Sequence, residues 1–85
     1  MFEIKYARSV KKDLSRIDRK HLEKIKHEIE SLAKFPEVPN IKKLSAHPLA
    51  DYRLRVGDYR VLFDVLYQDE KVIFVLKIGH RKEVY

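Results

Sequence analysis

Residues 51 to 65 read DYRLRVGDYRVLFDV, and this stretch decides how the chain folds. Its centre, Gly57-Asp58, is a two-residue turn signal, because glycine supplies the positive φ that a tight hairpin needs. On both sides of the turn, apolar residues alternate with other residues at the period of half-buried strands. The stretch therefore predicts a β-hairpin, which also carries Arg53, Arg55 and Arg60 within eight residues.

The turn fixes which residues lie opposite one another, starting with Val56 and Tyr59. Directly opposed residues share a face of the sheet. One face is therefore apolar and is expected to lie under helices: Tyr52, Leu54, Val56, Tyr59, Val61 and Phe63. The three arginines fall on the other face, with Arg55 opposite Arg60. Like charges in this position destabilise a strand pair by roughly a few tenths of a kcal/mol, and such a conflict is expected chiefly at a functional site.

A second two-residue turn at Asp69-Glu70 predicts another strand near 71–80. We expect its register to place Leu76 opposite Phe63 and Ile78 opposite Val61. The same register gives an open face on which five cations converge: Arg53, Arg55, Arg60, Lys77 and Arg81. Asp64 shares that face and is the acidic residue available to neutralise it.

The first half of the chain predicts a strand over 2–6, where apolar residues alternate with charges. Apolar residues at helical spacing then predict a helix from about Arg8 to Ile17. They predict a second helix that Asp18 can cap and that Pro36 and Pro39 end.

The remaining segments complete the expected fold. Residues 39–51 are expected to connect the helices to strands near 52–56, 59–67 and 71–80. The fold class is α+β: an N-terminal strand and a helical hairpin packed on one face of a small, mainly antiparallel twisted sheet. One domain is expected to span residues 1–85, and the first strand is expected to join the sheet with no partner assigned.

The amino-acid composition limits the classes of function that the chain can have. The 85 residues include no cysteine, which excludes disulfides and zinc–thiolate sites and fits a cytoplasmic protein. No apolar run approaches the roughly 20 residues that span a membrane. Charged residues make up 38% of the chain and the net charge is +6. That charge favours a polyanionic partner, although it also serves solubility.

The five cations are suited to binding phosphate groups and to catalysing reactions at them. Arginine forks match phosphate oxygens, and fixed cations can catalyse phosphoryl transfer by charge stabilisation. No metal or cofactor is predicted, because the four histidines are dispersed and no HExxH, P-loop or GxSxG motif occurs. RNA supplies its own nucleophile, the 2′-hydroxyl, so cleavage of RNA without a metal ion is chemically feasible.

Three stretches together resemble the RelE/ParE toxin superfamily, and its RelE branch most closely: YARSVKKDLSRI (6–17), KKLSAHPLADYRLRVGDYRVLFDV (42–65) and VIFVLKIGHRKEVY (72–85). The resemblance covers nearly the whole chain and implies a RelE-like fold. It implies the toxin of a type II toxin–antitoxin pair, a ribosome-dependent endoribonuclease that cuts mRNA in the A site through 2′-hydroxyl attack. The implied partners are an acidic RelB-like antitoxin, the ribosome and mRNA, and operator DNA only as the toxin–antitoxin complex.

The resemblance also implies roles for individual residues. Arg60 would hold the scissile phosphate, Arg81 would stabilise or protonate the leaving 5′-oxygen, and Tyr85 would stack on a base or help take the 2′-proton. Arg53 and Arg55 match basic positions on the second strand of the family. Lys77 and His80 are expected to contact RNA. Because arginine keeps its proton at physiological pH and is therefore a poor base, the general base is expected to be Tyr85 or His80.

Two alternatives stay open. A toxin of the ParE branch shares the fold, acts on DNA gyrase and cuts nothing. That branch generally does not keep the set Arg60, Arg81 and Tyr85 complete. The second alternative is a non-catalytic module that binds RNA or regulates an operon.

Overall fold

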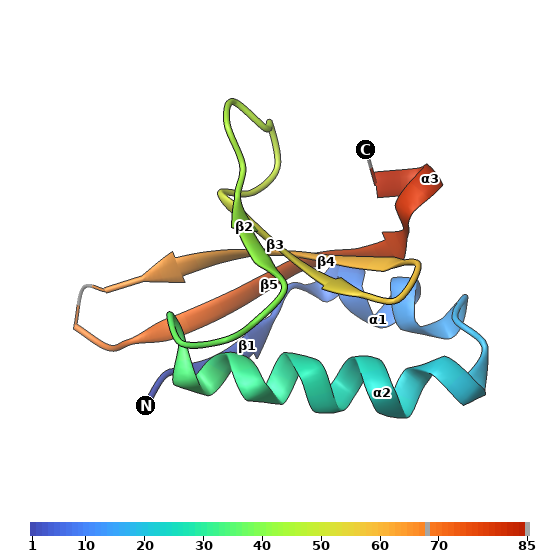
Figure 1. The fold of residues 1–85 in the computed structure, drawn as a ribbon, viewed down its shortest axis with the longest axis horizontal. Coiled ribbons are helices and arrows are strands. Elements are labelled where there is room, and N and C mark those ends of the chain that lie inside the picture. Colours follow the sequence, from blue (N-terminus) through green and yellow to red (C-terminus); the bar gives the residue numbers. More distant parts are fainter. Residues whose placement is uncertain (68, 85) are drawn as a thin grey trace.

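The computed structural model describes residues 1–67 and 69–84, the last two of them as backbone. The elements in chain order are β1 (Glu3–Tyr6), α1 (Arg8–Ser15), α2 (Arg19–Glu30), the 3-10 helix η1 (Ser31–Lys34), β2 (Ile41–Lys43), β3 (Tyr52–Val56), β4 (Tyr59–Leu66), β5 (Val72–His80) and α3 (Arg81–Val84). The strands form one sheet in the order β1-β5-β4-β3-β2. Only the β1–β5 pair is parallel among the described strands. The predicted α+β class is confirmed (Figure 1).

The hydrophobic core lies between the helices and one face of the sheet. Leu54, Val61 and Phe63 on this face are fully buried, as the hairpin register predicts. The helices and the turn between α1 and α2 contribute a buried stripe: Val10, Ile17, Ile25, Ile29 and Leu32. Each buried aliphatic or aromatic side chain of this kind stabilises the fold by about 1.5–3 kcal/mol relative to exposure, so the amphipathic patterns select this packing.

The helix limits follow from capping and proline. The Asp18 side chain accepts a hydrogen bond from the Lys20 amide at 3.3 Å and begins α2, as expected. The helix then tightens into η1 before Pro36, whose missing amide cannot continue it. No helix in the described part of the chain is both long and apolar enough to cross a membrane.

The structure assigns the partners that the sequence left open and adds a strand. β1 pairs with β5 in parallel. Within the predicted connection 39–51, Ile41–Lys43 forms β2 and pairs with β3. An extended run of three residues is too short to show a period, so the pattern alone does not reveal it.

The β4–β5 register is as predicted only up to Leu62. Val61 lies opposite Ile78, but the expected pair of Phe63 and Leu76 is wrong: a bulge leaves Leu76 as an extra residue, and Phe63 faces Val75. The buried positions explain it. Val75 and Ile78 are both buried, and a spacing of three cannot keep two residues on one face of a regular strand. The bulge inserts one extra residue into β5, so that Val75 and Ile78 both face the core.

Candidate functional site

The β3–β4 hairpin places its arginines on the face away from α1 and α2. Arg55 lies opposite Arg60 and Arg53 lies opposite Leu62, which confirms the predicted register. Leu62 in turn lies opposite Lys77. In Figure 1 the β2–β3 loop and α3 both rise on this side of the sheet, and α2 runs along the other side.

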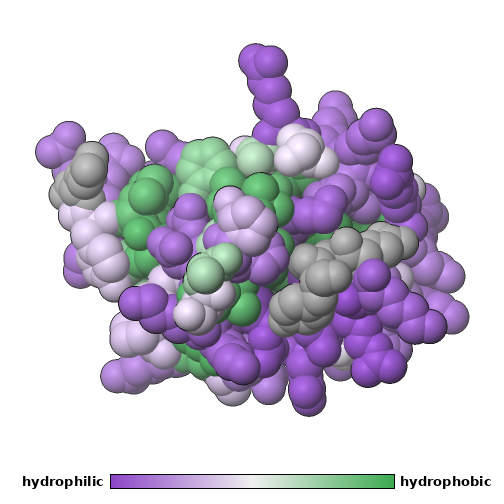
Figure 2. Space-filling view, turned by 90° about the horizontal axis from the view of Figure 1, so that it is seen from above, coloured by the Kyte–Doolittle hydropathy of each residue, from purple (hydrophilic) through white to green (hydrophobic). Residues whose placement is uncertain are grey.

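This face is only partly open, which corrects the expectation of an open face. Leu62 is completely buried, because Leu44 and Ala50 of the β2–β3 loop pack on it together with Leu76. Figure 2 looks onto this side and shows apolar side chains gathered towards the left and hydrophilic ones towards α3 on the right. The apolar loop thus covers the part of the face around Leu62.

Asp64 holds the β2–β3 loop in place. Its Oδ1 accepts a hydrogen bond from the Asp51 amide at 2.7 Å, and the Leu44 amide donates to the Asp51 carbonyl at 2.7 Å. The first bond fastens the end of the loop to β4, and the second joins the two ends of the loop to each other. The carboxylate that could neutralise the arginines therefore has a structural partner.

Lys42 is a cation of this face that the sequence pattern does not reveal. It lies opposite Arg53 in the β2–β3 pair and is exposed. Its place follows from β2, which the sequence did not predict. Cross-strand pairing therefore adds a positive charge beside Arg53 and extends the cationic surface to the edge of the sheet.

Arg60 is held against the hairpin turn. Its Nη1 donates to the carbonyl oxygens of Gly57 and Tyr59, each at 3.1 Å. The side chain is half-buried, whereas Arg55 opposite it is exposed. Because the guanidinium is fixed by backbone acceptors, it presents its charge at a defined place with less entropy left to lose on binding a ligand.

Arg81 reaches the same region by a different route from the one expected. β5 ends at His80, so strand alternation does not place Arg81 on the arginine face. It is instead the first residue of α3, and its amide donates to the Asp58 carbonyl at 2.8 Å. The turn between β3 and β4 therefore contacts both Arg60 and Arg81.

His80 lies on the helix side of the sheet. It is paired with Tyr59 across the strands, and the two rings meet edge to face with their centroids 5.8 Å apart. The ring centroid of His21, in α2, lies 5.4 Å from that of Tyr59. The Nδ1 atom of His80 accepts a hydrogen bond from the Lys82 amide at 3.3 Å. The structure does not bring His80 onto the face that carries Arg60.

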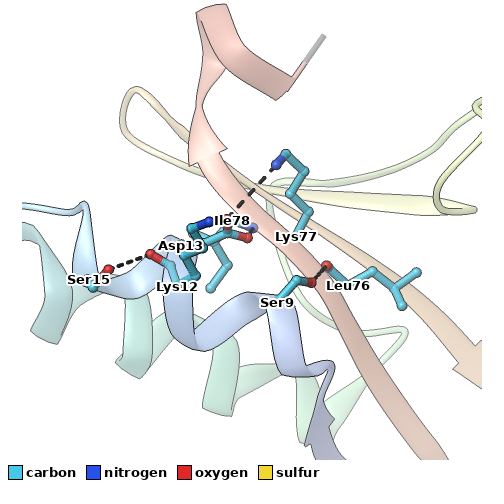
Figure 3. A network of polar contacts seen from close by, with 7 residues as sticks. All are labelled: Ser9, Lys12, Asp13, Ser15, Leu76, Lys77 and Ile78. Carbon is cyan, nitrogen blue, oxygen red and sulfur yellow. Dashed lines mark hydrogen bonds and ion pairs between the residues drawn. The ribbon is translucent and has the colours of Figure 1, made fainter.

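Lys77 is tied to α1 at the edge of the sheet. Its Nζ lies 3.9 Å from Oδ1 of Asp13, whose Oδ2 accepts a hydrogen bond from the Ile78 amide at 3.0 Å (Figure 3). Ser9 Oγ also donates to the Leu76 carbonyl at 3.4 Å. Asp13 was not singled out from the sequence, because a lone acidic residue on an amphipathic helix gives no signal of such a contact.

Tyr85, the expected stacking residue, lies outside the described residues. The site as described therefore consists of Arg53, Arg55 and Arg60 on the sheet, with Lys42 beside them and Arg81 joined to the turn. Arginine and lysine are the side chains that proteins use to bind phosphate groups.

A second surface feature lies between the helices. A groove of about 570 Å³ is lined largely by apolar side chains of α1 and α2, including Leu14 and Leu22. Arg8, Lys11 and Lys26 also line it. Burial, and then the nearby Glu30 carboxylate, raise the pKa of the Tyr6 phenol at one side of the groove. This tyrosine therefore stays neutral at physiological pH.

Comparisons with known proteins agree with the fold and identify the family. The family model described as the ParE toxin of the type II toxin-antitoxin system, parDE, matches residues 4–85. A Methanocaldococcus jannaschii protein named as toxin RelE1 is 34% identical over 99% of this chain and 94% of its own length.

Solved structures match as well. A chain of the archaeal RelE-RelB complex from Pyrococcus horikoshii OT3 has a TM-score of 0.74 and 32% identity, with 94% of each chain covered. A chain of the RelB-RelE antitoxin-toxin complex from Methanococcus jannaschii has a TM-score of 0.71 and 27% identity, covering 95% of this chain and 94% of that one. The chain belongs to the RelE/ParE family, and it is a RelE-type toxin of a type II toxin–antitoxin system.

Proposed function

We propose that this toxin is a ribosome-dependent endoribonuclease that inhibits translation by cutting mRNA in the ribosomal A site. The observation that carries the proposal is the arginine face: Arg60 is fixed by two carbonyls, Arg55 lies directly opposite it and Arg81 is joined to the same turn. Fixed cations that face a phosphate stabilise the charge that develops during phosphoryl transfer.

The chemistry follows from RNA itself. The 2′-oxygen attacks the adjacent phosphorus, the bond from phosphorus to the 5′-oxygen breaks, and a 2′,3′-cyclic phosphate and a 5′-hydroxyl form. Arg60 binds the phosphate oxygens and Arg81 stabilises or protonates the leaving 5′-oxygen. Tyr85 stacks on a base or helps to take the 2′-proton. Arg53 and Arg55 bind neighbouring phosphates, and no metal ion takes part.

A cognate acidic antitoxin is proposed to silence the toxin. The solved relatives are complexes of RelE with RelB. On this chain, the groove between α1 and α2 is apolar and is flanked by Arg8, Lys11 and Lys26. An amphipathic helix with acidic flanks fits such a groove by shape and charge. The complex, and not the free toxin, is proposed to bind operator DNA.

The test is a cell-free translation reaction with mapped mRNA ends. We expect cuts inside codons at the A site, with 2′,3′-cyclic phosphate ends and a requirement for ribosomes. Arg60→Ala and Arg81→Ala should each lower the cleavage rate by about 10²–10³. Arg19→Ala removes an exposed arginine from the start of α2 and should leave the rate unchanged. Full activity of both site variants would contradict the assignment.

One observation favours a second candidate: the matching family model bears the ParE description. A ParE-type toxin acts on DNA gyrase. In that case mRNA would stay intact in the same reaction, while replication in cells that express the toxin would stop.

A further inference from the structure

The turn between β3 and β4 contacts the candidate site through three consecutive carbonyls. The oxygens of Gly57 and Tyr59 accept hydrogen bonds from Arg60 Nη1, and the Asp58 oxygen accepts one from the Arg81 amide. Two cations from different elements are thus joined to one short loop.

The conformation of this loop is defined by its φ angles. Gly57 has φ +59°, and the positive-φ residues among the described non-glycines are Asn40 and Ala46, so Asp58 has a negative φ. A positive φ followed by a negative φ in a two-residue hairpin loop is a type II′ turn, which takes glycine at its first central position. An added Cβ at Gly57 would meet nothing within 4 Å. Backbone conformation, and not lack of space, therefore explains the glycine.

Type II′ and type I′ turns differ mainly in the peptide that joins the two central residues, which is rotated by about 180° between them. The carbonyl of that peptide belongs to Gly57 and is one of the two acceptors of Arg60. A change of turn type would therefore move this acceptor away from the guanidinium. The Asp58 carbonyl, which binds the Arg81 amide, belongs to the next peptide and would move much less.

We infer that Gly57 is a positioning residue: the type II′ turn that it permits aims its own carbonyl at Arg60 and sets where that guanidinium lies. The catalytic part of this inference rests on the proposed nuclease function, whereas the position of the guanidinium is measurable without it.

The test replaces the turn while keeping the hairpin. Asparagine followed by glycine strongly favours type I′, so the double variant Gly57→Asn, Asp58→Gly should keep the strands paired and rotate the peptide. Asp58→Ser is the matched control, because it removes the same carboxylate and keeps glycine first, as type II′ requires. Thermal unfolding should show that both variants fold.

Two readouts decide the matter. In NMR spectra of the side-chain guanidinium groups, Arg60 should be restricted in the wild type and in Asp58→Ser, and should gain rotational freedom in the double variant. In the cleavage reaction, the kcat of the double variant should fall by about 10²-fold, the effect of a misplaced group of about 1 Å, with little change in KM.

Each outcome has a separate meaning. A double variant whose Arg60 is as restricted as in the wild type, or which cleaves at the wild-type rate, overturns the inference. If the wild type cuts no mRNA, the proposed function fails, and the NMR comparison alone still decides whether Gly57 positions Arg60.

Discussion

Arg55 and Arg60 are direct neighbours across β3 and β4, yet their environments differ. Arg60 donates to two turn carbonyls and is half-buried, whereas Arg55 is exposed. Among the described residues, backbone acceptors therefore hold only the Arg60 side of this like-charge pair. Removing either charge relieves the same repulsion, but only Arg60→Ala also deprives two carbonyls of a charged donor.

This difference gives a prediction for stability. We expect Arg60→Ala to lower the free energy of unfolding by about 1 kcal/mol, the net value of a typical intramolecular hydrogen bond. Arg55→Ala should raise it by roughly a few tenths of a kcal/mol, as repulsion in the strand pair is relieved. Urea unfolding followed by circular dichroism measures both. Equal shifts for the two variants would show that the turn contacts do not stabilise the fold.

At the scale of elements, β5 is protected by two neighbours in succession. β1 pairs with its first half, up to Val75, and the Ala7 amide adds one more bond, to the Val75 carbonyl at 2.8 Å. Beyond that point α1 lies along the strand, where Asp13 accepts from the Ile78 amide (Figure 3). An uncovered strand edge is a site of unwanted pairing. Asp13 therefore protects the edge of the second half of β5, as β1 protects the first half.

Substitution of Asp13 tests this role. Asp13→Ala should lower the free energy of unfolding by about 1–3 kcal/mol, because a partly buried amide is left without an acceptor. Asp13→Asn is the control: it keeps a side-chain oxygen for the Ile78 amide and loses only the charge beside Lys77, so its cost should be smaller. Hydrogen exchange at the Ile78 amide should be faster in Asp13→Ala alone. Unchanged exchange there would contradict the assignment.

The whole molecule carries a net charge of +6, and two of its surfaces carry several cations each. One is the arginine face, and the other is the rim of the α1–α2 groove. A proposed acidic antitoxin that contacts both would be attracted over a long range before contact. Electrostatic steering of this kind raises association rates and is screened by salt.

We therefore expect the association rate with the partner from the adjacent gene to fall steeply from low to high salt, as stopped-flow measurements can show. Lys26→Glu, at the groove, should slow association more than Lys71→Glu, at the β4–β5 hairpin, although both change the net charge equally. A rate that is independent of salt, or equal for the two variants, would argue against charge-guided docking on the groove.

The sequence by itself determined the parts of this protein that depend on local pattern. Alternation around Gly57-Asp58 gave the hairpin, its register and the face on which Arg53, Arg55 and Arg60 lie. Capping by Asp18 gave the start of α2, and Pro36 gave the end of the helical run that α2 and η1 form together. These follow because strand period, turn conformation and helix caps are set by residues a few positions apart.

Only the tertiary structure decided what depends on contacts between distant segments. The loop near Ala50 buries Leu62 and covers part of the face, and a bulge moves Leu76 out of the predicted register. Arg81 leaves the strand and is joined to the turn through its backbone. The physical reason is that a buried apolar side chain, or an unpaired backbone group, is satisfied by whichever segment the whole fold brings near it, and no local pattern specifies that segment.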